Sequence, residues 1–194
     1  MAGPLPQSGD NELFPAAMTL SSEGWRPVSE ERMAALAEAL EQRKLEGTVL
    51  NEPRELEGLS ADMHSFSPLL TERLRGCRAQ LAVRVTTLEQ VREVAASCAR
   101  LGVTLTLRGA GTGNYGQCVP LAGGVVLDLS GLRQLRDVDP VSGVVTAEAG
   151  CLLADLDRQL ACHGRALRLT PSTYRSASLG GFIAGGSGGI GSLR

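Results

Sequence analysis

The chain has 194 residues, of which 43% are hydrophobic and 21% charged, a composition that suits one globular domain or slightly more. Its formal net charge of −2 excludes the basic footprint of a nucleic-acid-binding protein. There is no long apolar run, so we expect no transmembrane segment, and the first residues lack the basic and apolar regions of a secretory signal.

The cysteines and histidines point away from metal chemistry. Five cysteines occur without a CxxC pair, and neither His64 nor His163 has ligand-like spacing to a cysteine pair. We therefore expect no metal site and reduced thiols, which are typical of a cytoplasmic protein.

The N-terminal part is predicted to be partly irregular. Residues 1–24, rich in Pro, Gly and Ser, form a loose arm in this interpretation, and residues 25–79 form a helical and irregular segment. Within it, Ser29 is a candidate N-cap for a helix that carries an apolar stripe and ends at Gly47. We expect a short strand at 48–50 and little regular structure over 51–80.

Periodic patterns begin at residue 80, where we place the start of the main domain. Residues 81–85 and 103–107 read as strands joined by a helix, which begins with the capping box of Thr87 and Gln90 and stops at Gly102. This predicts a parallel strand–helix–strand unit. Further strands are expected at 125–129, 135–138 and 144–149, the last two as a hairpin, followed by a helix at 152–160.

A glycine-rich stretch, Arg108–Gln117 (RGAGTGNYGQ), directly follows the strand at 103–107. Glycine lets the backbone approach a ligand closely, and successive backbone N–H groups in such a loop can cradle an anion. The stretch therefore predicts a phosphate cradle, and a plain surface turn is the alternative. A second glycine cluster spans 180–191.

Gly111–Gly116 matches the G-x-G-x-x-G pattern of a dinucleotide-binding Rossmann loop, but the surroundings do not fit. Residues 117–124, which include Pro120, leave no room for the helix that such a loop must open. A P-loop is excluded because the only lysine is Lys44. We expect instead a cradle between a parallel strand and a hairpin strand.

Four blocks occur in an order that resembles one known family: 103–112 (VTLTLRGAGT), 123–130 (GGVVLDLS), 144–150 (VVTAEAG) and Pro171 followed by 177–181 (ASLGG). The order is similar to that of the FAD-binding domain of the p-cresol methylhydroxylase and vanillyl-alcohol oxidase type. Within it, the chain looks most like the FAD-linked oxidases of the glycolate oxidase and D-lactate dehydrogenase group. The resemblance covers about residues 80–194. It implies an α+β fold with a small parallel βαβ subdomain, a partial mixed or antiparallel β subdomain, and FAD between them.

The resemblance also assigns cofactor-binding residues. The first glycine loop would bind the FAD pyrophosphate, and the second segment would line the flavin and the ribityl chain. The residues so assigned are Arg108, Gly109, Ala110, Gly111, Thr112, Gly113, Asn114, Gln117, Pro171, Ser172, Ser178, Leu179, Gly180, Gly181, Gly185 and Gly188. Relatives with covalent flavin often carry a histidine where this chain has Thr112, so we expect non-covalent FAD.

The implied activity is oxidation of a 2-hydroxy acid by hydride transfer to FAD, but the sequence offers no candidate catalytic residue. The family's FAD domain continues with further strands and a substrate domain, so the chain resembles a member truncated at its C-terminus. Two alternatives remain open. One is a non-catalytic fragment or subunit that binds FAD weakly or needs a partner polypeptide. The other is a flavin reductase of cell-wall precursor synthesis.

Overall fold

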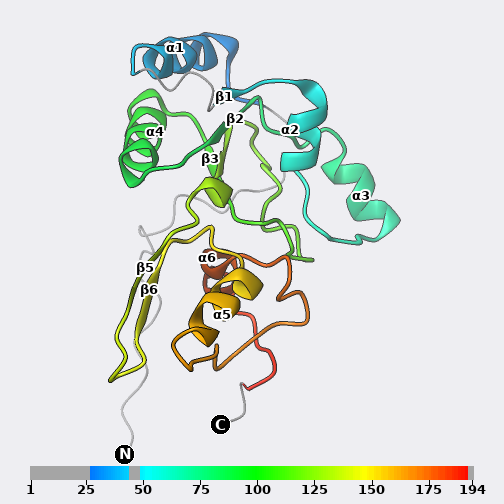
Figure 1. Ribbon diagram of the computed structural model, residues 1–194. Coiled ribbons are helices and arrows are strands. Elements are labelled where there is room, and N and C mark those ends of the chain that lie inside the picture. The colour runs from blue at the N-terminus through cyan, green and yellow to red at the C-terminus, as the bar shows by residue number, and fades with distance from the viewer. Residues whose placement is uncertain (1–26, 44–48, 192–194) are drawn as a thin grey trace, which may run out of the picture.

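A computed structural model describes residues 27–43 and 49–191 (Figure 1). The predicted arm at 1–24, the helix end at Gly47 and the first residue of the predicted strand at 48–50 lie outside these residues. The described chain forms an upper part, in which helices flank a sheet, and a lower part with a hairpin and two helices (Figure 1). Neither part contains a helix both long and apolar enough to span a bilayer, within the ranges described.

The upper part is built on a four-stranded sheet in the order β1-β2-β4-β3. Its strands are β1 (Val49–Leu50), β2 (Leu81–Arg84), β3 (Leu105–Arg108) and β4 (Val125–Asp128). β4 lies in the middle, parallel to both β2 and β3, so that Leu81 and Leu105 both stand beside Val125. β1 pairs antiparallel with β2, and β3 is the edge strand next to the glycine loop.

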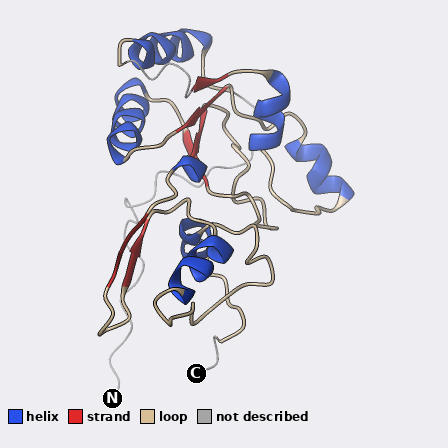
Figure 2. Ribbon diagram, in the orientation of Figure 1, coloured by secondary structure: helices blue, strands red, loops and turns tan. Residues whose placement is uncertain are grey.

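Helices cover both faces of this sheet because its side chains alternate between two apolar clusters. Val83 and Leu127 point into the larger cluster, beneath α1 (Glu30–Glu41) and α4 (Leu88–Leu101). Ala82 and Val126 face the smaller cluster, beneath α2 (Pro53–Leu59). A further helix, α3 (Pro68–Leu74), lies beside α2 at the edge of the molecule (Figure 2).

The boundaries of α4 are set by the local signals expected from the sequence. Thr87 accepts a hydrogen bond from the N–H of Gln90, and the Gln90 side chain accepts one from the N–H of Thr87, which completes the capping box. Gly102 then ends the helix in the left-handed conformation with φ of 62°.

The lower part begins after a short 3-10 turn, η1 (Leu129–Gly131). β5 (Leu135–Val138) and β6 (Val145–Ala147) form the expected antiparallel hairpin. α5 (Leu153–Ala161) buries Leu153, Leu156 and Leu160, and α6 (Leu179–Ala184) follows a long irregular segment (Figure 2).

The expectation that the strand at 125–129 belongs to a hairpin after the first subdomain was wrong. β4 is the central, parallel strand of the first sheet. The whole connection from Gly109 to Gly124 counts toward the crossover, and this exceeds the dozen or so residues that a parallel connection needs. The connection contains no helix, so the argument against a Rossmann loop is unaffected.

Three short helices were not expected from the sequence. α2 and α3 begin at prolines, Pro53 and Pro68, a position that favours a helix start. α6 contains Gly180 and Gly181, and glycine lowers helix propensity. Ser178 stabilises it as an N-cap that accepts a hydrogen bond from the N–H of Gly181.

Candidate functional site

A cavity of about 770 Å³ opens between the edge strand β3, the first glycine loop and α6. This volume lies within the usual range for small-molecule and cofactor sites. The wall is mostly apolar or glycine, with contributions from Leu107, Leu121, Leu129, Ala149 and Phe182. The two glycine clusters, far apart in the sequence, therefore face one cavity.

The first glycine loop presents unused hydrogen-bond donors to this cavity. Gly111, Thr112 and Gly113 line it, and their backbone N–H groups have no partner within the described part of the chain. Gly111 has φ of 67°, and a Cβ on it would lie only 2.1 Å from the Arg108 guanidinium, so no other residue fits there without strain. Three successive donors on a close-approach loop form an anion cradle.

Ser178 joins the two glycine segments. Its Oγ accepts hydrogen bonds from the N–H of Ala110, at 3.2 Å, and from the N–H of Gly181, at 3.3 Å. A Cβ on Gly109 would lie 2.3 Å from this oxygen, so the contact requires glycine at that position. One hydroxyl thus fixes the start of the first loop against the start of α6.

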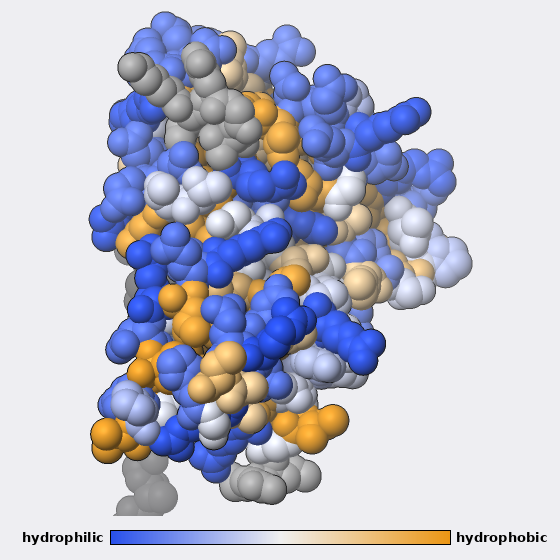
Figure 3. Space-filling model, in the orientation of Figure 1, coloured by the Kyte–Doolittle hydropathy of each residue, from blue (hydrophilic) through white to orange (hydrophobic). Residues whose placement is uncertain are grey.

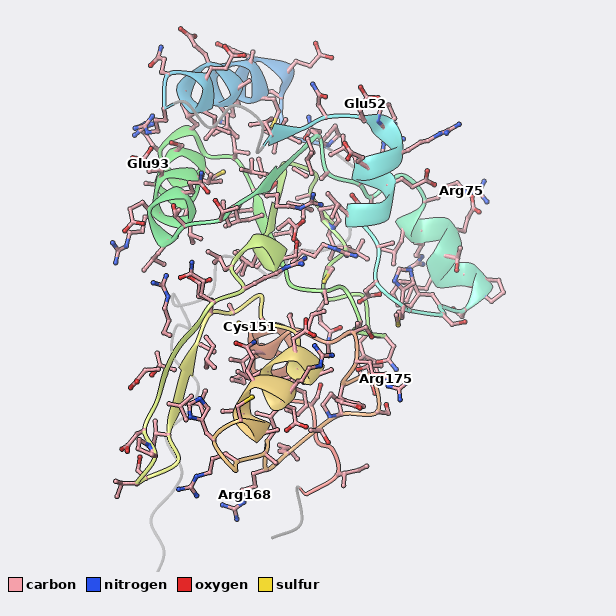
Figure 4. All side chains as sticks on the ribbon, in the orientation of Figure 1. Glu52, Arg75, Glu93, Cys151, Arg168 and Arg175 are labelled. Carbon is pink, nitrogen blue, oxygen red and sulfur yellow. The ribbon has the colours of Figure 1, made fainter. Side chains whose placement is uncertain are left out.

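The second segment is anchored to the lower part by its backbone. The N–H groups of Leu179 and Gly180 donate to the carbonyls of Cys151 and Ala149, both at 2.8 Å. Cys151 lies just before α5, where the hairpin, α5 and α6 come together (Figure 4). A Cβ on Gly180 would meet the Ala149 methyl at 2.7 Å, so α6 packs closely against the end of the hairpin.

Charged groups lie behind the first loop, on the side away from the cavity. Arg108 donates from its guanidinium to the carbonyls of Leu59 (3.2 Å) and Ala61. The side chain of Asp62 is fully buried and accepts a hydrogen bond from the N–H of Gly116. Burial raises the pKa of the nearby Cys118 thiol, although the Arg108 charge acts in the opposite direction.

Most of the residues expected to contact a cofactor do line the cavity. They are Gly109, Ala110, Gly111, Thr112, Gly113, Gln117, Pro171, Ser178, Gly180, Gly181 and Gly185. The other expected residues do not line the cavity: Arg108, Asn114, Ser172, Leu179 and Gly188. Of these, Arg108 supports the loop from behind, and Leu179 holds α6 to Cys151.

The sequence did not single out the apolar wall. The cavity is also lined by residues 104–107, most of which belong to β3, and by Cys118, Val119, Leu121 and Phe182. β3 lines it because β3 is the edge of the sheet, and strand order is not a local property. Within the described ranges, no group of three or more His, Cys, Asp or Glu side chains could hold a metal ion.

A glycine-rich anion cradle and a mostly apolar cavity, at the edge of a parallel sheet, define a nucleotide-cofactor-binding domain. The model of the FAD binding domain family matches residues 79–194, and the chain belongs to this family. The cavity fits that cofactor: the unpartnered N–H groups suit its pyrophosphate, and the apolar wall suits its ring system.

Curated relatives agree with this family. The chain is 32% identical to a putative mitochondrial D-lactate dehydrogenase of Schizosaccharomyces pombe, over 69% of this chain and 25% of that protein. It is 32% identical to the glycolate oxidase subunit GlcD of Escherichia coli, over 73% of this chain and 26% of the relative. It is 28% identical to the mitochondrial D-2-hydroxyglutarate dehydrogenase of Rattus norvegicus, over 86% and 29%. The chain thus spans between a quarter and a third of the length of these relatives.

Solved structures show the same fold. Alkyldihydroxyacetonephosphate synthase superposes on 84% of this chain with a TM-score of 0.73 at 19% identity, which covers 30% of that chain. p-Cresol methylhydroxylase with bound substrate superposes on 81% of this chain with a TM-score of 0.66 at 21% identity, also covering 30% of that chain. The expected FAD-binding fold of the p-cresol methylhydroxylase type is confirmed.

Proposed function

We propose that the chain is the FAD-binding part of an oxidoreductase that oxidises a 2-hydroxy acid, and that it binds FAD without a covalent bond. The observation that carries the binding proposal is the row of backbone N–H groups at Gly111, Thr112 and Gly113, which line the cavity and have no partner among the described residues. These donors would hold the pyrophosphate. The substrate class is supported by the relatives, which are named for D-lactate, glycolate and D-2-hydroxyglutarate.

The lining supports non-covalent binding. No described residue that lines the cavity is a histidine or a tyrosine; His64 lies behind the loop, and His163 is exposed after α5. Cys118 does line the cavity, but burial raises the pKa of its thiol and so disfavours the nucleophilic thiolate. Bound FAD supplies the hydride acceptor, while the protein binds and orients it. The apolar side chains of Leu107, Leu129 and Phe182 would exclude water from its ring system.

The lining also limits what this chain does alone. Apart from the Cys118 thiol, no described lining residue has an ionisable side chain, so the wall offers no carboxylate or imidazole as a general base. We propose that groups outside the described wall bind the 2-hydroxy acid and take its proton. The residues of this chain would bind and orient the cofactor.

A second candidate function is an FAD-binding subunit or fragment that needs another polypeptide. Exposed apolar side chains outside the cavity lining favour it: Ile183 on α6 is 68% exposed, and Ile190 is 80% exposed. Hydrophobic residues also reach the surface in the lower part (Figure 3). A polypeptide that covers these side chains would remove them from water.

The binding proposal is tested by titrating the purified chain with FAD and following flavin fluorescence. The variant Gly111→Ala should weaken FAD affinity about tenfold or more, because it strains the cradle at φ of 67° and displaces Arg108. Gly164→Ala is the matched control: its φ is 65°, but a Cβ there would meet nothing within 4 Å, and it lies away from the cavity. Absence of binding by the wild type, or equal losses in both variants, would overturn the proposal.

Two further measurements test whether FAD is bound without a covalent bond and whether a 2-hydroxy acid reduces it. Acid precipitation should release all FAD into the supernatant, and retention of flavin on the protein would contradict non-covalent binding. Anaerobic addition of glycolate, D-lactate or D-2-hydroxyglutarate should bleach the flavin spectrum only when the substrate-binding groups are present. Both candidate functions therefore predict FAD binding without bleaching in the isolated chain, and bleaching there would contradict the proposal that groups outside the described wall bind the substrate.

A further inference from the structure

Behind the glycine loop, residues 59–66 form a strap that closes over the face opposite the cavity. We propose that Asp62, in this strap, is a positioning residue of the cofactor site. It holds the end of the glycine loop, and thereby keeps the N–H groups of Gly111–Gly113 directed into the cavity. The proposal rests on the proposed FAD site.

The strap contacts the loop at several consecutive points. Oδ2 of Asp62 accepts a hydrogen bond from the N–H of Gly116 at 3.0 Å. The N–H of Met63 donates to the carbonyl of Gly113 at 2.8 Å. The Phe66 ring packs against the α-carbon of Gly116, since a Cβ there would lie 2.6 Å from the ring. The strap thus holds the end of the cradle through both backbone and side-chain contacts.

Asp62 is fixed within the strap before it reaches the loop. Its side chain is fully buried, and its Oδ1 accepts hydrogen bonds from the backbone N–H of His64 at 3.0 Å and from Nδ1 of the imidazole at 2.5 Å. The His64 ring stacks on Phe66 with 3.9 Å between centroids. A buried carboxylate requires such partners, and together they leave Oδ2 for the loop.

The direction of these bonds decides which donors remain for a ligand. In a trans peptide the C=O and the next N–H point in opposite directions. Because the Gly113 carbonyl is turned to Met63, the N–H of Asn114 points away from the strap, and the peptide that directly follows the cradle is fixed; Asn114 itself lies outside the cavity lining. The N–H of Gly116, by contrast, is taken by Asp62, so the set of free donors ends before it.

The negative charge of Asp62 disfavours binding of an anion in the cradle. The effect of its charge can therefore be distinguished from the effect of its hydrogen bond to the loop. A carboxylate behind the cradle repels a pyrophosphate, while the Arg108 guanidinium, packed against Gly111, attracts it. If Asp62 acts by position, a substitution that keeps one acceptor oxygen should lose less FAD affinity than one that keeps none. If its charge dominated, every substitution that removes the carboxylate should raise FAD affinity, because it removes a repelling charge.

The experiment compares Asp62→Ala with Asp62→Asn in the 194-residue chain. Asp62→Ala leaves the N–H of Gly116 unpaired and should weaken FAD affinity about tenfold or more. Asp62→Asn should lose less affinity, because its single amide oxygen can still accept from the N–H of Gly116, although its NH2 group then replaces the oxygen that accepts from His64. Asp157→Ala is the matched control, because Asp157 accepts a hydrogen bond from the N–H of Leu167 at 2.8 Å, and neither residue lines the cavity. It should leave FAD affinity unchanged.

Hydrogen exchange in the absence of FAD gives an independent measure. Peptides that cover residues 109–118 should exchange faster in Asp62→Ala than in the wild type and in Asp157→Ala. A merely structural role would lower the melting temperature without separating the variants in loop exchange or in FAD affinity. Should Asp62→Ala fail to fold, Asp62→Ser is the milder truncation, with the same expected direction.

The outcomes distinguish the two proposals. If the wild type does not bind FAD, the proposed function fails, and loop exchange alone still judges the role of Asp62. If loop exchange in the truncated variant matches that of Asp157→Ala, the positioning role is wrong. A gain of FAD affinity in both Asp62→Ala and Asp62→Asn would also overturn it, because loss of the repelling charge would then outweigh any loss of position.

Discussion

Cys98 shows how burial acts on a single ionisable group. It lies on α4 in the main core with 1% of its surface exposed, and desolvation raises the pKa of its thiol from 9.0 to about 11. The folded state therefore holds this proton more tightly than the unfolded chain. Its contribution to stability is complete below pH 9 and is lost as the pH rises toward 11.

We expect Cys98→Val to flatten the alkaline loss of stability. The slope that one such group adds between its two pKa values is at most about 1.4 kcal/mol per pH unit. Urea unfolding over this pH range, followed by circular dichroism, measures the free energy of unfolding. Cys162→Ala, which changes an exposed cysteine, is the control and should keep the wild-type slope. Identical slopes in all three proteins would contradict the assignment.

At the scale of elements, the Thr87 hydroxyl is one half of the capping box at the start of α4. Thr87→Ala removes the acceptor for the N–H of Gln90 and should lower the free energy of unfolding by about 1 kcal/mol. Thr87→Ser keeps that acceptor and should restore most of the loss. Chemical denaturation measures both. A Thr87→Ala variant as stable as the wild type would show that the cap contributes nothing.

Elements with strong local patterns were predictable, and the others were not. Periodicity and caps predicted α4 and the strands at 81–85 and 103–107, which correspond to β2 and β3 with ends that differ by one or two residues. α6 was missed because its two glycines conceal a helix that tertiary contacts stabilise, among them the bond from Gly180 to Ala149. The central place of β4 was missed because strand order depends on the whole sheet.

One part of the candidate site could be predicted from the sequence, and another part could not. The glycine loop was visible because anion cradles need glycine at close spacing. The strap was not, because Asp62 reaches Gly116 from a segment without periodicity, more than fifty positions earlier in the chain. Residues that hold a loop from behind leave no local signal, since their role depends on the partner and not on their neighbours.

At the scale of the whole molecule, the division at residues 79 and 80 remains a prediction from the sequence. The family match begins at residue 79, yet β1 pairs with β2 in one sheet, and Leu36 and Leu40 of α1 lie in the same core as Val83 and Leu127. α1 packs over α4 at the top of the molecule (Figure 1). In the described structure, the matched segment therefore shares its sheet and core with the residues before it.

Leu36 provides a direct test of this dependence. Its side chain is 0% exposed, so Leu36→Ala should lower the free energy of unfolding by about 2–5 kcal/mol through lost burial and a residual cavity. Leu69→Ala is the matched control: Leu69 lies on α3 with 80% of its surface exposed, and its loss should cost less than about 0.5 kcal/mol. Both are measured by urea unfolding with a probe on the matched segment, such as hydrogen exchange of β4. If β4 keeps wild-type protection in Leu36→Ala, the segment from residue 79 onward folds independently of α1. If protection of β4 falls together with global stability, the two form one cooperative unit.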